Sequence, residues 1–166
     1  MTELDNSPLA SRLAFYGIDP QSAEFPKIAA ALTRFSDKAM EHFYQRVAST
    51  PETARHFSGK ATMDKAQKAQ IQHWQRMFAG GLGAPYLEAS KAIGNVHARI
   101  GLEPKWYIGG YANILSEVIE AILTSGTSRF SPRRRSEARM IAMFIKVALM
   151  DMDLAITRYF EASDES

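Results

Sequence analysis

The chain has 166 residues, of which 46% are hydrophobic and 23% charged, enough for one folded domain with a sizeable core. Its formal net charge of +2 gives no reason to expect a polyanionic partner, so no binding to nucleic acid is predicted. The absence of cysteine excludes disulfides, thiolate metal sites and cofactors attached through thioether bonds. Neither a signal peptide nor an apolar run long enough for a membrane span occurs, so a cytoplasmic location is predicted.

Apolar residues recur at three- and four-residue spacings along almost the whole chain, and no stretch alternates with a period of two. The fold class is therefore predicted to be all-α. Proline in the first turn marks several helix starts, and glycine marks most of the ends. In chain order, the predicted helical segments are 8–16, 20–49 with a break near Ser36 left open, a short turn over 51–57, 61–79, 85–100, 104–124 and 132–162.

The helix predicted over 132–162 carries apolar residues on two sides, as a helix buried on two sides does. One stripe consists of Ile141, Phe144, Ile145, Ala148, Leu149, Met152, Ile156 and Tyr159. The second stripe, which is the candidate for contact with a partner, consists of Met140, Met143, Val147, Met150 and Leu154.

The helix predicted over 104–124 also carries apolar residues on two sides. One side carries Tyr107, Tyr111, Ile114, Val118 and Ile122, while Ile108, Leu115 and Ile119 turn toward another side. Because a soluble monomer rarely exposes so much apolar surface, a homodimer formed through helices 104–124 and 132–162 is predicted. A single wide core face is the alternative interpretation.

The four histidines, His42, His56, His73 and His97, are the candidates for metal chemistry, since no zinc-protease motif, catalytic triad or phosphate-binding glycine loop occurs. His97 differs from the others because it lies in the last turn of the 85–100 helix, on the face of Ile93 and Ile100. The helix dipole and the free carbonyls at that end suit an imidazole that binds a metal. A core histidine bonded to a carbonyl fits the same spacing, so the spacing alone leaves both interpretations open.

The stretch Val96–Tyr111, with the sequence VHARIGLEPKWYIGGY, resembles the proximal segment of the globin-coupled sensors. In that bacterial family, a globin binds haem b and regulates an attached output domain. The segment from His42 to Pro51 and the segment from Gln67 to Trp74 resemble the family's distal segments, in the same order along the chain. The resemblance implies a globin fold of the sensor-globin type, with an N-terminal extension and short helix (1–19), a sensor globin domain (20–162) and a disordered tail (163–166).

The resemblance also implies which residues form the site. His97 matches the proximal iron ligand of a haem b that, without cysteine, is held non-covalently. Tyr44 matches a distal hydroxyl that donates a hydrogen bond to the bound gas, and Gln67 and Gln70 match two further distal positions. Glutamine at both departs from the family pattern, which leaves open how either amide acts. The remaining haem-pocket residues implied are Phe43, Ile71, Ile93, Ile100 and Tyr107, the last of which matches a tyrosine that responds to movement of the proximal ligand.

The predicted function is that of a non-enzymatic, haem-based sensor that binds O2, or CO or NO, and signals to an output domain outside this chain. His73 is an alternative ligand at the sixth iron position, whereas His42 and His56 are expected at the surface. Two other functions remain open. A non-sensor globin, for oxygen storage or NO dioxygenation, shares the iron site but does not explain why the last two helices are apolar on two sides. A purely structural dimerisation module does not explain the segment from His97 to Tyr111.

Overall fold

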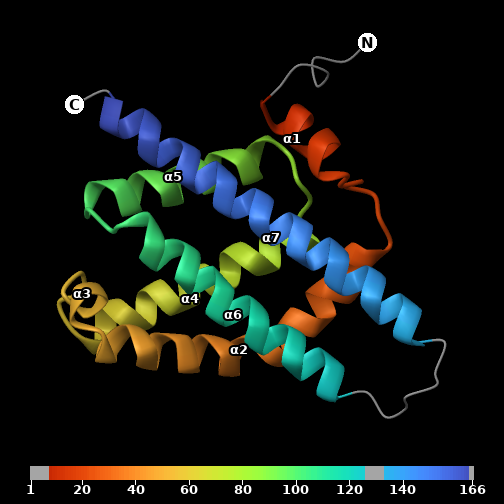
Figure 1. Ribbon diagram of the computed structural model, residues 1–166, viewed down its shortest axis with the longest axis horizontal. Helices are drawn as coiled ribbons and strands as arrows, with labels where there is room; N and C mark the ends of the chain where they lie inside the picture. The colour runs from red at the N-terminus through yellow and green to blue at the C-terminus, as the bar shows by residue number, and fades with distance from the viewer. Residues whose placement is uncertain (1–7, 126–132, 165–166) are drawn as a thin grey trace.

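The computed structural model describes residues 8–125 and 133–164, and within these ranges helices are joined by turns and loops without strands, which confirms the predicted all-α class. The helices are α1 (Pro8–Tyr16), α2 (Glu24–Ser49), α3 (Pro51–Ala54), α4 (Lys60–Ala79), α5 (Ala84–Arg99), α6 (Pro104–Thr124) and α7 (Arg133–Asp164), as Figure 1 shows. Their bounds lie within a few residues of the predicted ones, and α2 continues unbroken through Ser36. The first two residues of the predicted tail belong to α7, while residues 1–7 and 165–166 lie outside the described ranges.

The end of α5 is defined by a local backbone motif that follows directly from the sequence. Gly101 has a φ of 69°, a left-handed conformation that glycine adopts without the steric cost of a side chain. The N–H of Leu102 donates to the carbonyl of His97 at 3.1 Å, and the N–H of Gly101 donates to that of Ala98 at 3.0 Å. These two bonds form a Schellman motif, so α5 ends at Arg99, two residues after His97.

The longest helix, α7, lies across the rest of the domain and packs against α1, α2, α5 and α6 (Figure 1). Its contact with α5 is especially close at Gly94, where an added Cβ would lie 2.7 Å from the carbonyl oxygen of Ala155. α4 and α6 both pack against α2. This arrangement leaves α2, α4, α5 and α6 around a common interior space, with α7 behind them.

The structure divides the apolar residues of α7 differently from the two predicted stripes. Val147 and Met150, predicted to face a partner, are completely buried within the chain, so that prediction is wrong. The reason is that α7 packs against several helices at once and therefore buries a face wider than one stripe. What remains toward solvent is a row along the opposite side, which we call the outer face of α7: Ile141, Ile145, Leu149, Met152, Ile156 and Phe160.

The two predicted sides of α6 are confirmed. Its inner side is buried, and Ile108 and Leu123 on the other side are 44% and 56% exposed. Leu115 and Ile119 lie between them and are partly exposed. Among the described helices, none is both long and apolar enough to cross a membrane.

Candidate functional site

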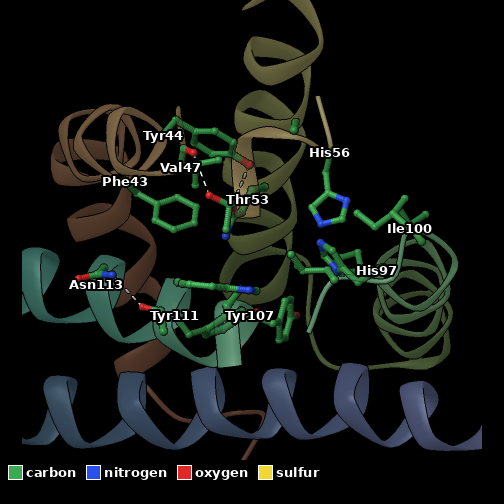
Figure 2. Close-up of a pocket in the computed structure, with 18 of the residues that line it drawn as sticks. Phe43, Tyr44, Val47, Thr53, His56, His97, Ile100, Tyr107, Tyr111 and Asn113 are labelled. Carbon is green, nitrogen blue, oxygen red and sulfur yellow. Dashed lines mark hydrogen bonds between the residues drawn. The ribbon is translucent and has the colours of Figure 1, made fainter. Parts of the chain in front are cut away.

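A cavity of about 580 Å³ lies between α2, α4, α5 and α6 (Figure 2). Its volume falls within the usual range of about 300–1,000 Å³ for cofactor and small-molecule sites. Most of its lining is apolar, and a few polar side chains converge on it from different helices. The predicted residues that line it are Phe43, Tyr44, Gln70, Ile93, His97, Ile100 and Tyr107.

Two predicted pocket residues, Gln67 and Ile71, are not among the described residues that line the cavity. The lining face of α4 consists of Ala66, Ala69, Gln70, His73 and Trp74. Residues three apart on a helix differ in direction by roughly 60°, so Gln67 points to one side of Gln70. Ile71 instead packs against the hydrophobic core.

The His97 side chain reaches the cavity from the last turn of α5, and its ring lies 4.9 Å from that of Tyr107 on α6. Burial lowers the pKa of His97 to about 4, an effect that the Ile93 backbone carbonyl partly opposes and that His56 slightly increases. The imidazole is therefore neutral at pH 7 and keeps a lone pair for a metal. Its Nδ1 is buried with no hydrogen-bond partner of ordinary geometry among the described residues. The Ile93 carbonyl, one turn earlier, becomes its acceptor if the ring turns slightly.

The opposite wall of the cavity is formed by a tyrosine and a glutamine. The hydroxyl of Tyr44 on α2 donates a hydrogen bond to Oε1 of Gln70 on α4 at 3.1 Å. Burial raises the pKa of Tyr44 well above its ordinary value, so the phenol stays protonated and remains a donor. The neighbouring Phe43 contacts the Tyr44 ring edge-on and fills the space beside Gly110, where an added Cβ would lie 3.0 Å from its ring.

The other histidines are placed in three different ways. His73 lines the cavity, but its Nε2 lies 3.0 Å from a carboxylate oxygen of Asp151, so that nitrogen is already engaged. His42 is half-exposed beside Glu117, as predicted for a surface residue.

His56 differs from the prediction, because it lines the cavity close to His97 (Figure 2). Its Nε2 is buried with no hydrogen-bond partner within the part of the chain that the structure describes. Sequence periodicity could not have revealed this placement, because His56 lies in the turn after α3, outside any helix.

One cavity of this helical domain thus holds a neutral histidine on one wall and a phenol donor on the opposite wall, the arrangement expected from the sequence. The profile of the protoglobin family matches residues 5–165, which is nearly the whole chain. The chain therefore belongs to the protoglobin family.

Individual proteins are also similar to this chain, one in sequence and two in fold. The heme-based aerotactic transducer HemAT of Halobacterium salinarum is 24% identical over 169 residues, which cover 96% of this chain and 34% of the transducer. The globin domain of the Geobacter sulfurreducens globin-coupled sensor superposes with a TM-score of 0.73 at 17% identity, covering 90% of this chain and 95% of that domain. The ferric globin domain of E. coli DosC superposes with a TM-score of 0.66 at 15% identity, covering 92% and 99%.

Proposed function

We propose that this chain is a haem-based gas-sensor domain that binds haem b non-covalently through His97 and responds to O2. The observation that carries the proposal is the presence, in one apolar cavity, of a neutral imidazole and a buried phenol donor (Figure 2). The aerotactic function named for the Halobacterium relative supports it, although the chain spans only about a third of that protein.

The described residues fit haem in three respects. The cavity has the size and apolar lining that a porphyrin requires. The unpartnered Nδ1 of His97 lies near the Ile93 carbonyl, and ligating histidines usually donate their second N–H to such an oxygen. The exposed side chains of Arg46 and Lys105 line the cavity and are suited to pairing with the two carboxylates of haem. The bound iron would supply reversible binding of a diatomic gas.

The distal residues would discriminate between gases through their hydrogen bonds. Dioxygen would gain negative charge from ferrous iron and become a good hydrogen-bond acceptor, and the Tyr44 hydroxyl could then turn from Gln70 toward it. Alternatively, Tyr44 keeps its bond to the Gln70 carbonyl oxygen, and the Gln70 amide N–H donates to the gas. Carbon monoxide is a weaker acceptor and benefits less from either donor.

Tyr44→Phe therefore provides the test of the proposed function. In the haem-loaded chain, we expect O2 to dissociate roughly 5- to 100-fold faster, because one buried hydrogen bond contributes about 1–3 kcal/mol. Dissociation of CO should change much less. The measurement is stopped-flow absorption of the ferrous protein, with Tyr16→Phe as the control, because Tyr16 lies on α1, does not line the cavity and donates to Asp153 on α7.

The double variant Tyr44→Phe/Gln70→Leu would show whether the two donors act together, since coupled neighbours are not additive. If the O2 kinetics of Tyr44→Phe match those of the parent chain, the Tyr44 hydroxyl does not contact the gas. If the parent chain takes up no haem, the proposed function itself is wrong.

We further propose that two copies of the chain pair through α6 and α7. The outer face of α7 and the exposed side of α6 together present an apolar surface that a soluble monomer does not normally leave uncovered. A two-fold axis would bring the same surface of each copy together in a four-helix contact. An interface between two copies also favours a regulatory role over oxygen storage, because a globin that only stores oxygen does not need to pair.

Leu149→Glu, in the middle of the outer face of α7, should convert the dimer to a monomer while leaving haem binding largely intact. Leu149 is 40% exposed, so the fold can accept a charge there, whereas two buried carboxylates at a paired interface repel each other. Sedimentation velocity at micromolar concentration is the measurement. Gln72→Glu, an exposed position on α4 with the same change in charge, is the control. A monomeric parent chain with haem bound would contradict the dimer.

A further inference from the structure

A buried carboxylate behind the cavity carries a further inference. Asp151 on α7 is 1% exposed and accepts hydrogen bonds from four side chains. Its Oδ1 accepts from Ser90 at 2.9 Å, from Tyr86 at 2.8 Å and from Nε2 of His73 at 3.0 Å, and its Oδ2 accepts from Tyr111. We call these five residues the Asp151 cluster.

The Asp151 cluster joins the walls of the cavity to α7. His73 lies one turn after Gln70 on α4, and Ser90 lies two turns before His97 on α5. On α6, Tyr111 lies one turn after Tyr107, whose ring contacts that of His97. Three walls of the cavity, α4 with Gln70, α5 with His97 and α6 with Tyr107, are therefore hydrogen-bonded to one side chain of α7.

The charge of Asp151 makes these links stiff. Burial by itself would raise the pKa of Asp151, but the hydrogen bond and charge of His73, and the bonds from Tyr111 and Tyr86, hold it below its ordinary value. The carboxylate is therefore ionised at pH 7, and hydrogen bonds to a charged group are stronger than those between neutral groups. Because a buried anion cannot lose a donor without a large cost, a shift of α5 or α6 obliges α7 to follow.

The place of Asp151 on α7 connects it to the outer face. Leu149 of that face lies two residues before Asp151, on the opposite side of the helix, and Met152 of the same face is the next residue after Asp151. A movement of the Asp151 carboxylate is thus a movement of the middle of the outer face. Small shifts at a ligand site act on a second site when one element has two packed arrangements.

We propose that Asp151 is a positioning residue that couples the cavity to α7, through its bonds to Tyr86 and Ser90 on the helix that carries His97. The proposal rests on the proposed function, because it requires a gas bound in the cavity. Asp151 itself touches neither the cavity nor the gas. Its role is to pass the displacement of α5 to the outer face of α7.

The test is hydrogen–deuterium exchange of α7 peptides in the ferrous, haem-loaded chain, with and without CO. In the parent chain, we expect CO to change the exchange rate of residues 140–160 on the order of fivefold or more, the lower end of usual coupling between sites. In Tyr86→Phe/Ser90→Ala and in Asp151→Asn, the ratio of the two rates should fall close to one. Neither Tyr86 nor Ser90 lines the cavity, so haem uptake and CO binding should persist.

Tyr16→Phe is the matched control, because the Tyr16 hydroxyl also donates to an aspartate of α7, Asp153, at 3.5 Å, but comes from α1 rather than a cavity wall. This control should keep the parent's response to CO. A purely structural role for the cluster would raise exchange equally in both states and leave their ratio unchanged, which would overturn the proposal.

The remaining outcomes separate this inference from the proposed function. If the parent binds haem and CO but α7 does not respond, the coupling is wrong and the gas site stands. If the parent binds no haem, both fall. If Asp151→Asn does not fold, the double variant Tyr86→Phe/Ser90→Ala provides the test, because it keeps the carboxylate and the donors from α4 and α6. A CO response of α7 in this double variant equal to the parent's would contradict the proposal.

Discussion

Replacing His97 with alanine should abolish stoichiometric haem binding. The side chain is the neutral imidazole of the cavity, and its backbone carbonyl is held by Leu102 in the motif that ends α5. Loss of a residue that merely orients a metal ligand lowers metal affinity about 10- to 100-fold, so loss of the ligand itself should exceed that. Titration of the apo chain with haem, followed by absorption of the ferrous and ferric states, measures the effect.

Free imidazole supplies a second readout for His97→Ala. The substitution leaves a space beside Tyr107 where imidazole can enter and provide the missing nitrogen, so added imidazole should restore part of the parent spectrum. His42→Ala is the control, since His42 is a half-exposed histidine outside this cavity. Unchanged haem retention and unchanged spectra in His97→Ala would mean that another residue holds the iron.

The helices and the placement of His97 could be predicted because both depend on local sequence. The helical spacing of apolar residues, the prolines at helix starts and the stop at Gly101 each depend on residues within one or two turns of one another. The observed helices confirm these predictions. The choice between Gln67 and Gln70 could not be made in the same way. A rotation of α4 by about 60° about its axis would point Gln67 where Gln70 points, and only the packed fold determines that rotation.

The burial of Val147 and Met150 within the chain and the hydrogen bonds of Asp151 were missed for a related reason. Apolar spacing shows that Val147 and Met150 need burial, but not whether the same chain or a second copy buries them. Asp151 has the appearance of an ordinary charge that interrupts an apolar helix. Its donors come from positions 40 to 78 residues earlier in the chain, so only the tertiary structure brings them together.

His73→Leu should destabilise the fold strongly. The His73 side chain is 10% exposed and lies beside a carboxylate that is 1% exposed, so its removal leaves a buried charge without its histidine partner. Breaking such a buried pair costs about 3–5 kcal/mol. For a domain of this size, that corresponds to a fall in Tm of roughly 6–20 °C, since each kcal/mol shifts Tm by about 2–4 °C. Urea unfolding followed by circular dichroism at pH 7 measures the loss.

The pH dependence of stability gives an independent check on the same pair. Because the pKa of Asp151 is lowered in the fold, its contribution is present above the ordinary value of 3.8 and is lost as pH falls through the lowered value. The difference in unfolding free energy between the parent and Asp151→Asn should therefore shrink as the pH falls from about 5 through the lowered pKa of Asp151. The lowered pKa of His97 makes the apo chain less stable between pH 6.5 and about 4, but it does so in both proteins and cancels in the difference.

Arg12→Leu shows whether the stability lost in His73→Leu is specific to a buried pair or follows from the loss of any ion pair on α7. Arg12 binds Asp153 at 2.8 Å, also on α7, but both side chains are partly exposed, at 22% and 31%. Pairs exposed to solvent contribute about 0–1 kcal/mol, so Arg12→Leu should cost far less than His73→Leu. In the double variant His73→Leu/Asp151→Asn, the cost should be smaller than the sum of the two single costs, because the unpaired charge is gone. Equal costs for His73→Leu and Arg12→Leu would show that the carboxylate of Asp151 does not depend on His73.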